Sequence, residues 1–419
     1  MANQKTKIAG LPARRAALRM LDAVMRRGET LDQAEKSALS GVNAPADRAL
    51  ARAIVGETLR WLTDLDALID SATRKNLPDD AKPRSVLRLM LAQSLRLDTP
   101  GHAVVATGLE LLSGGPRRLA HGVFSALMKR EVSLPDVPTL PDRVMVRWED
   151  RAHAIAPGLI DPPEVDLAIK APAEAQERAT AMGGISLSSG HVRLPRGTPI
   201  ERLPGFDDGA WWVQDLAAQI APRLLGQGDG RRALDLCAAP GGKTLALAAA
   251  GWRVTALDIS EKRLELLREN LKRTNLEADI VKADALEYAP EKPFDAILLD
   301  APCTATGTAR RHPDVLHRVG PRQIGELIET QQSLIYQAIE WLPKGATFLY
   351  AVCSLEVEEG EDQAAWIDET FDLTPSPITN DELPAGLQPT KEGWLRTHPG
   401  MLPDQGGLDG FFMARWVKP

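Results

Sequence analysis

Residues 232–244 read RALDLCAAPGGKT, and this stretch decides the fold of the C-terminal half of the chain. Its first five residues, Arg232 to Leu236, predict a strand, and Lys243 to Ala250 predict a helix. Between them, Gly241 and Gly242 allow a tight turn whose backbone N–H groups can approach a ligand closely. A strand, a glycine turn and a helix in this order form the first unit of a doubly wound α/β sheet, which binds ligands at the C-terminal ends of its strands.

Strands and helices alternate onward from this turn to the end of the chain. We expect further strands at Val254–Leu257, Asp279–Lys282, Ala296–Leu299 and Thr347–Val352. Helices are expected at Glu261–Thr274 and Gln323–Leu342. This alternation builds a mostly parallel sheet with helices on both faces, so residues 206–419 are predicted to form one Rossmann-like α/β domain.

The N-terminal third has a different pattern, because residues 13 to about 130 predict helices with almost no strand signal. In the first helix, one apolar face contains Ala17, Leu18, Leu21, Val24 and Met25. Gly28 is a plausible C-cap for it. Further helices are expected at Asp47–Ile69, Ser85–Leu95, Ala103–Leu112 and Arg117–Lys129. We therefore predict an all-α domain over residues 1–135.

Clustered prolines mark a linker and a small module over residues 136–205, in which Val165–Ile169 and His191–Leu194 are short candidate strands. The charge is uneven along the chain, since residues 1–130 carry a net +8 and the remainder −15. A basic N-terminal third is consistent with an anionic partner, or with nothing more than a solvated helical surface.

Targeting signals and cysteine frameworks are not evident. Residues 1–10 contain Lys5 and Lys7 but no apolar run behind them, which argues against a signal peptide. No apolar stretch approaches the roughly 20 residues that span a bilayer, so we expect a cytoplasmic protein without membrane contact. The three cysteines, Cys237, Cys303 and Cys353, have no CxxC spacing. Neither a disulfide framework nor a metal site is expected.

The glycine turn is the candidate cofactor site. A phosphate-binding P-loop would need a glycine five residues before Gly242, where Cys237 stands instead. Asp258 ends the second strand, where a carboxylate can accept from ribose hydroxyls, and Asp284 after the third strand could accept from an adenine amino group. Either aspartate could also be a helix N-cap. Taken in order, these residues favour an adenosine-type ligand without a triphosphate.

Two cysteines follow the ends of predicted strands, Cys303 after Asp300 and Cys353 after Val352. A lone cysteine is usually an inert, small apolar residue. A thiolate that adds to C6 of cytosine makes C5 nucleophilic enough to take a methyl group, which is covalent catalysis. Asp300 could engage N3 of the ring if burial raises its pKa. The residues alone do not choose which cysteine attacks.

Three runs resemble the Sun/Nop family of RNA cytosine-C5 methyltransferases: LDLCAAPGGKT, LLDAPCTATGTARRHPD and YAVCS. The resemblance implies S-adenosylmethionine as cofactor and Cys353 as the residue that attacks C6. It implies that Cys303 assists release of the product. The implied cofactor contacts are Cys237, Ala238, Ala239, Pro240, Gly241, Gly242, Lys243, Asp258, Asp284 and Asp300.

The N-terminal helices resemble the NusB-type RNA-binding domain at Ala46–Leu50 and Leu59–Leu62. Together the two resemblances imply a bacterial enzyme acting on small-subunit (16S) ribosomal RNA, with transfer RNA as the alternative substrate and no obligate protein partner. Arg310 and Arg311 are candidate RNA contacts, or part of a solvated loop. The pair Trp211-Trp212 could stack a base, although core packing is the simpler interpretation.

Two rival functions remain at this stage. A DNA cytosine-C5 methyltransferase would need only the proline-linked Cys303 and no helical RNA-binding extension. A non-catalytic RNA-binding protein on a methyltransferase fold would not need both cysteines and the glycine turn, all of which are present.

Overall fold

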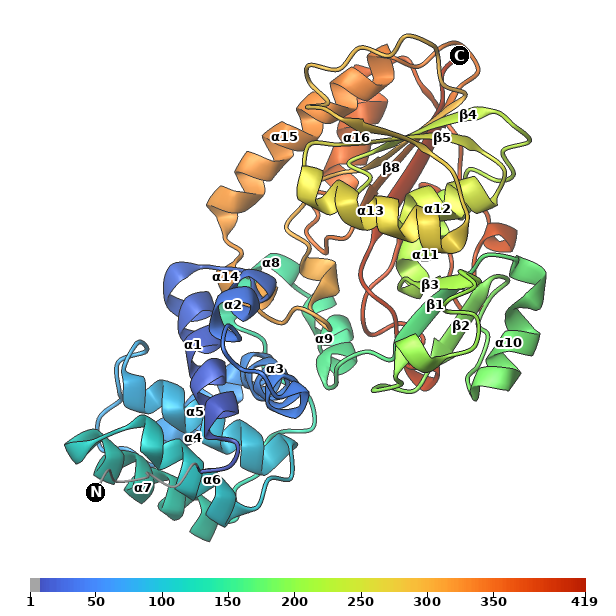
Figure 1. The fold of residues 1–419 in the computed structure, drawn as a ribbon. Helices are drawn as coiled ribbons and strands as arrows, with labels where there is room; N and C mark the ends of the chain where they lie inside the picture. The colour runs from blue at the N-terminus through green and yellow to red at the C-terminus, as the bar shows by residue number, and fades with distance from the viewer. Residues whose placement is uncertain (1–7) are drawn as a thin grey trace. The chain divides into compact units, whose positions relative to one another are not determined.

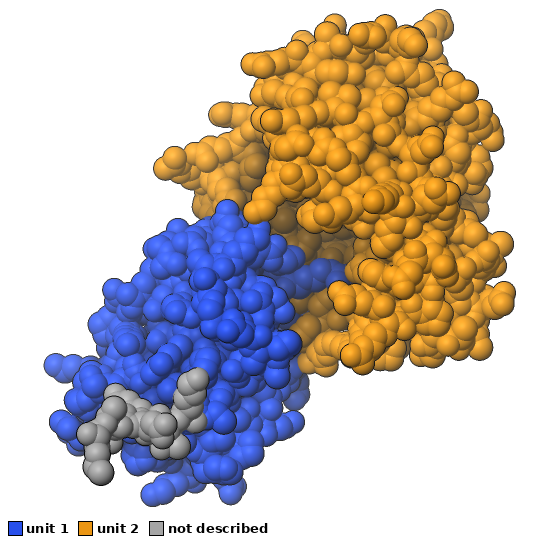
Figure 2. Space-filling model, viewed as in Figure 1, with its two compact units in different colours: residues 1–160, 311–318 blue, residues 161–310, 319–419 orange. Residues whose placement is uncertain are grey.

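The computed structural model describes residues 8–419, so Lys5 and Lys7 lie outside the described residues. The chain forms two compact units (Figure 2). Unit 1 contains residues up to 160 together with residues 311–318, and unit 2 contains residues 161–310 and 319–419. The boundary after Ile160 lies inside the segment 136–205 that the sequence pattern groups as one module.

Unit 1 is helical (Figure 1). Its α-helices are α1 (Leu11–Arg27), α2 (Leu31–Ala38), α3 (Pro45–Arg60), α4 (Leu62–Ser71), α5 (Lys82–Arg96), α6 (Gly101–Gly108), α7 (Gly114–Lys129), α8 (Asp142–Trp148), α9 (Arg151–Ile155) and α14 (Val315–Arg318). Helix α1 buries the predicted apolar face except for Met25, which is 36% exposed. Gly28 caps this helix as predicted, with a φ of 66°.

The helix expected over Asp47–Ile69 is in fact two helices, because the backbone turns at Trp61. This residue has a φ of −105° and a ψ of 18°, and it joins α3 to α4. Its indole is buried, and the guanidinium of Arg96 lies 4.9 Å above the ring. Neither glycine nor proline marks the break, so tertiary packing rather than a local breaker produces it.

Residues 311–318 pack among the helices of unit 1 although they follow the proline-cysteine motif in sequence. The backbone N–H of Leu31 donates to Oδ2 of Asp314 at 3.2 Å. Burial lowers the pKa of His317 to about 4, so its ring is neutral at pH 7. Nε2 of His317 lies 2.7 Å from the carbonyl of Leu59 and can therefore donate to it. This short segment completes the interior of unit 1.

Unit 2 is built on a large mixed sheet with strand order β10-β11-β8-β7-β4-β5-β6, and β9 pairs with β11. Strands β4 to β8 are parallel, whereas β11 is antiparallel to β8. The strands are β4 (Arg232–Leu236), β5 (Arg253–Asp258), β6 (Asp279–Lys282), β7 (Ala296–Asp300), β8 (Thr347–Val352), β9 (Thr374–Pro375), β10 (Leu395–Arg396) and β11 (Phe412–Val417). The order in which strands join the sheet reverses at β4, because β5 and β6 lie on one side of it and β7 and β8 on the other. In sheets of this kind the ligand crevice lies at the C-terminal end of the strand where the order reverses.

Alternate residues of each central strand pack on opposite faces of the sheet. Leu234 and Ile297 belong to a core formed with α15 (Pro321–Glu340) and α16 (Glu361–Thr370). Ala233 and Leu298 pack on the other face, toward α11 (Leu216–Arg223) and α12 (Gly242–Ala249). Helix α13 (Glu261–Thr274) packs beside α12. This period of two places helices on both faces and confirms the predicted doubly wound fold.

A second, three-stranded sheet of unit 2 has the order β2-β1-β3, with α10 (Ala175–Met182) packed on it. Its strands are β1 (Val165–Ile169), β2 (His191–Leu194) and β3 (Trp211–Val213), so both predicted short strands are present.

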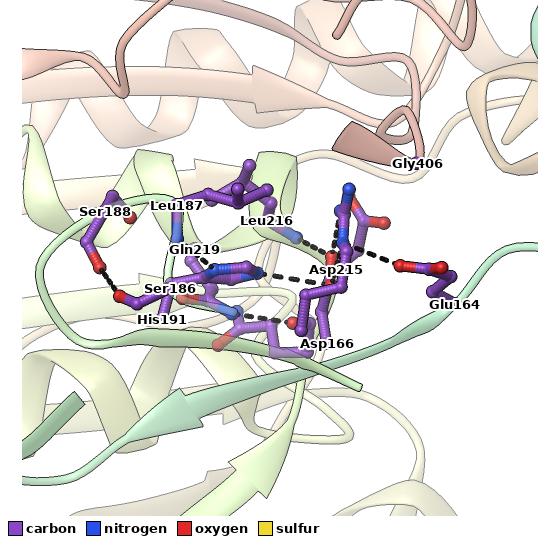
Figure 3. A network of polar contacts seen from close by, with 12 residues as sticks. Glu164, Asp166, Ser186, Leu187, Ser188, His191, Asp215, Leu216, Gln219 and Gly406 are labelled. Atoms are coloured by element: carbon purple, nitrogen blue, oxygen red, sulfur yellow. Dashed lines mark hydrogen bonds and ion pairs between the residues drawn. The ribbon is translucent and has the colours of Figure 1, made fainter. Parts of the chain in front are cut away.

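A buried carboxylate joins this small sheet to α11 (Figure 3). Asp166 accepts two hydrogen bonds from Arg193 at 2.7 and 2.8 Å and one from the N–H of Leu216 at 2.9 Å. Nε2 of His191 lies 3.2 Å from the same carboxylate. Burial alone would raise the pKa of Asp166, but these donors hold it well below its usual range.

No helix within residues 8–419 combines the length and the apolar character needed to cross a membrane.

Candidate functional site

The glycine turn between β4 and α12 is held in left-handed backbone conformations. Cys237 has a φ of 64° and Gly241 a φ of 108°. A Cβ atom at Gly241 would stand 2.2 Å from Cδ1 of Leu267 in α13, so any side chain there would displace Leu267. Burial, followed by nearby carboxylates, raises the pKa of Cys237 to about 12. This cysteine is therefore a neutral, structural thiol.

A cavity of about 390 Å³ opens on the turn. Six of the predicted cofactor residues line it: Ala238, Ala239, Pro240, Gly242, Lys243 and Asp300. The lining also includes Trp212, Gln214, Asn270 and Arg273. The volume lies in the range of small-molecule sites, and the lining combines apolar surface with a few polar groups, as such sites do. Cys237, Gly241, Asp258 and Asp284 are not part of the lining.

The two aspartates proposed to bind adenosine accept hydrogen bonds from backbone N–H groups. Asp258 is buried and accepts from the N–H groups of Ala239 at 3.0 Å and Ser260 at 2.8 Å. Asp284 accepts from the N–H of Leu286 at 2.9 Å. Asp258 thus ties the glycine turn to the end of β5. Because each carboxylate oxygen has two lone pairs, these bonds leave capacity for a ligand hydroxyl.

Lys243 and Asp300 form a close ion pair, with Nζ 2.6 Å from Oδ2. Burial alone would lower the pKa of Lys243, but the charge and hydrogen bond of Asp300 raise it, with smaller contributions from Cys353 and Asp235. Lys243 is therefore an ammonium ion. Both side chains line the cavity.

The two candidate catalytic cysteines lie together. Sγ of Cys303, after β7, is 3.5 Å from Sγ of Cys353, after β8. The hydrogen bond with Cys353, burial, and the negative charges of Cys353 and Glu359 raise the pKa of Cys303 well above its usual value. Cys303 is therefore a protonated thiol, and its S–H can donate to Sγ of Cys353. The structure thus brings together the two cysteines that follow separate strands in the sequence.

The other candidate residues have different surroundings. Arg310 is buried in unit 2 and donates to the carbonyl of Gly406 at 2.5 Å. Arg311 is half-exposed and belongs to unit 1. Trp211 and Trp212 are buried, so they form part of the core.

Sequence reasoning missed Glu359, a fully buried carboxylate between the two cysteine segments. It lies within the acidic run from Glu356 to Asp362, which has the composition of a solvated surface. Its distance of six residues from Cys353 gives no periodic signal, so only the folded structure reveals it.

Comparisons with known proteins agree with this architecture. Residues 222–417 match the family described as 16S rRNA methyltransferase RsmB/F, and residues 11–115 match the NusB family. Ribosomal RNA small subunit methyltransferase B of Xanthomonas campestris is 32% identical over 451 residues, covering all of both chains. The protein of the same name from Escherichia coli (strain SMS-3-5) is 30% identical and covers 97% of this chain and 98% of its own.

Solved structures support the fold. The crystal structure of PH0851 covers 97% of this chain and 99% of its own, with a TM-score of 0.72 and 22% identity. A methyltransferase homolog from Pyrococcus horikoshii covers 66% of this chain and 94% of its own, with a TM-score of 0.55 and 27% identity. The predicted combination of an α/β methyltransferase domain with a NusB-like domain is confirmed.

Proposed function

The chain belongs to the RsmB/F family of 16S rRNA methyltransferases, and from this premise we propose that it transfers a methyl group from S-adenosylmethionine to C5 of a cytosine in 16S ribosomal RNA. Family membership makes it an RNA methyltransferase. The choice of C5, of the cofactor and of a covalent route rests on the site. The observation that carries it is the pair of sulfur atoms 3.5 Å apart at the ends of β7 and β8.

The cofactor site fits S-adenosylmethionine by its donor set. The cavity offers apolar walls, backbone close to Gly242, and the carboxylate of Asp300 for a cationic ligand. Asp258 closes the end of β5, where a ribose is held in folds of this kind. When bound, S-adenosylmethionine supplies an electrophilic methyl group. The glycine turn contains no P-loop, which is consistent with a ligand that has no triphosphate.

In this reaction the two cysteines and the Lys243–Asp300 pair have separate roles. The thiolate of Cys353 adds to C6, and N3 of the ring takes up a proton from the Lys243 ammonium group, which the Asp300 carboxylate holds in place. C5, now enamine-like, takes the methyl group. Once Cys353 is bonded to C6, its hydrogen bond and negative charge no longer raise the pKa of Cys303, so Cys303 releases its proton to solvent. The Cys303 thiolate accepts the C5 proton, the C5–C6 double bond forms again, Cys353 leaves as thiolate, and N3 returns its proton to Lys243.

Alanine variants of the two cysteines test these roles, because the two roles predict opposite phenotypes. Cys353→Ala cannot form the C6 adduct, so we expect it to be inactive and to leave no covalent RNA. Cys303→Ala can add and methylate, but it stalls before elimination and remains linked to RNA as a slow band on a denaturing gel. The double variant should lose that band. A trapped band from Cys353→Ala and none from Cys303→Ala would exchange the roles of the two cysteines.

The substrate is tested separately from the chemistry. Bisulfite sequencing of total RNA from cells with and without the gene should show one or more protected cytosines in 16S ribosomal RNA that disappear with the gene. Loss of protection confined to transfer RNA would move the same chemistry to that substrate. No change in any RNA, combined with RNA binding by the purified protein, would support the non-catalytic alternative.

A further inference from the structure

The carboxylate of Glu359 accepts hydrogen bonds from the segment that contains Cys303 and from the segment that contains Cys353. The backbone N–H of Thr304 donates to Oε1 at 2.9 Å, and the Thr304 hydroxyl donates to Oε2. The hydroxyl of Ser354 donates to Oε2 at 2.5 Å. Nε2 of Gln331, on α15, donates to Oε1 at 3.0 Å. Since the two nitrogen donors have no acceptor role, the arrangement is satisfied by an ionised carboxylate, which is acceptor-only.

These donors are placed next to the reacting sulfurs in sequence. Thr304 directly follows Cys303, and Ser354 directly follows Cys353. The Gln331 amide also donates to the carbonyl of Pro302 at 3.0 Å, on the other side of Cys303. The two cysteine segments come from different strands, and they are 50 residues apart in the chain. A single carboxylate therefore cross-links the backbone around both thiols.

We propose that Glu359 is a positioning residue for the methyl-transfer site: its buried carboxylate holds the segments after β7 and β8 in register and keeps Cys303 as the thiol that donates to Cys353. The proposal deepens the proposed function and rests on it for its catalytic meaning. Its structural part, the control of thiol ionisation, can be tested in protein that has neither RNA nor cofactor bound.

The surrounding charges support this role. Burial raises the pKa of Glu359, opposed by the hydrogen bonds from Ser354, Thr304 and Gln331. The negative charge of Glu359 in turn contributes to the raised pKa of Cys303. Among the described residues, the ionisable groups beside this cluster include the buried Glu356, whose N–H donates to the Ser354 hydroxyl, and Tyr350, which donates to the Glu359 carbonyl. They also include the ion pair Arg396–Glu361 and, beside Cys353, the pair Lys243–Asp300.

Burial raises the pKa of Tyr350 well above its ordinary value, so its phenol stays neutral. Arg396 is committed to Glu361 and to the carbonyl of Ser354. Lys243 is committed to Asp300. Glu359 is thus the carboxylate that bonds directly to both cysteine segments.

The test measures thiol ionisation in the full-length protein without RNA. Glu359→Gln keeps the shape of the side chain but removes its charge, so the Cys303 thiolate is no longer repelled. We expect the rate at which iodoacetamide alkylates Cys303 at pH 8, followed by mass spectrometry, to rise severalfold, because a larger share of Cys303 is then thiolate. Alkylation of Cys237, whose pKa is set by groups other than Glu359, gives an internal reference. The control is Glu358→Gln, the same change at an exposed neighbour, which should leave both rates within twofold.

A Cys303 rate that stays within twofold of wild type in a folded Glu359→Gln protein overturns the proposal. If this variant does not fold, Thr304→Val removes one of the hydroxyl donors at nearly constant volume, and Thr304→Ser restores it. We then expect Thr304→Val to lower kcat for methylation at least tenfold with KM for RNA changed less than threefold, and Thr304→Ser to recover most of the rate. Equal activity of these two variants contradicts the positioning role.

The proposed function and the positioning role of Glu359 can be contradicted separately. If wild-type protein does not methylate cytosine but Glu359→Gln still shifts alkylation of Cys303, the proposed function fails and the positioning role survives. If wild-type protein methylates and alkylation does not shift, only the positioning role fails.

Discussion

At the scale of the residue, Gly241 combines two constraints that no other amino acid satisfies. Its φ of 108° is unfavourable for any residue with a Cβ atom, and that atom would overlap Leu267. We expect Gly241→Ala to lower the free energy of unfolding by about 2–4 kcal/mol, the sum of backbone strain and overpacking. Urea denaturation followed by circular dichroism measures the loss.

Gly251 provides the matched control. Its φ is 82°, but the nearest atom to an added Cβ is 3.7 Å away. Gly251→Ala therefore isolates the backbone term and should cost about 1 kcal/mol. Equal losses for the two variants would show that the contact with Leu267 does not restrict the turn.

Asp235 gives the stability of the protein a pH dependence. Burial raises its pKa to about 7, opposed by the hydroxyl of Thr244, which donates at 2.5 Å. The folded state therefore holds the proton more tightly than the unfolded chain between pH 4 and pH 7, so stability falls as pH rises through this window and levels off above it.

Asp235→Asn stays neutral at every pH and should remove this loss. We expect the variant to gain about 2–3 kcal/mol relative to wild type between pH 5 and pH 8, measured by urea denaturation at both values. Asp404→Asn, at an exposed carboxyl group, should show no such gain. A constant difference between Asp235→Asn and wild type across this range would mean that Asp235 does not titrate there.

The residues also show what the sequence could and could not predict. The positions of Asp300, Cys303 and Cys353 at strand ends follow from the strand pattern, because parallel strands end at one edge of a sheet. That the two sulfurs lie 3.5 Å apart depends on the register between β7 and β8, which no local pattern specifies. Burial of Arg310 was equally hidden, since a basic loop looks solvated until its tertiary partners are known.

At the scale of the element, the small sheet is fastened to the methyltransferase domain by Asp166. Removing this carboxylate would leave the buried guanidinium of Arg193 without its partner. We expect Asp166→Ala to cost about 3–5 kcal/mol and to make β1 and β2 accessible to protease before the large sheet. Limited proteolysis with peptide mapping checks the order.

Glu164 offers a contrast at the same guanidinium. Its carboxylate is 43% exposed and lies 4.0 Å from Nε of Arg193. Glu164→Ala should therefore cost less than about 1 kcal/mol. Comparable damage from the two variants would indicate that Asp166 is not the anchor of this sheet.

Elements with strong periodicity were predictable and those defined by packing were not. The strands β4, β6 and β8 and the helix α13 begin and end where the sequence pattern places them. The short helices α2, α8, α9 and α10 were missed, since one or two turns carry little periodic signal. The break at Trp61 was missed because it depends on residues distant in sequence.

At the scale of the whole molecule, the net +8 of residues 1–130 is proposed to provide RNA affinity. Not all of this charge is at the surface, because Arg84 and Arg88 are buried and form ion pairs with Asp66. The surface charge comes from exposed residues that include Arg15, Arg74, Lys75 and Arg118. Replacing these four by Gln should weaken RNA binding and flatten its dependence on salt by one unit or more of slope, because fewer counterions are released.

The control carries the same charge change in the other unit. Lys262, Lys282, Arg322 and Lys391 are exposed there, and their replacement by Gln should alter the slope less. Fluorescence anisotropy over a series of salt concentrations gives both slopes. If the two fourfold variants lose the same slope, the RNA affinity does not reside in the N-terminal helices.

The packing of residues 311–318 inside unit 1 has a consequence for the timing of biosynthesis. A ribosome delivers the first 160 residues early, but α14 and the His317 ring that meets Leu59 follow only after about 150 more residues have been added. At translation rates of about 5–20 residues per second, this delay is roughly 8–30 s. We therefore expect the nascent helical unit to lack α14 while β1 to β7 emerge, and to be completed before the large sheet, which still requires β8 and β11.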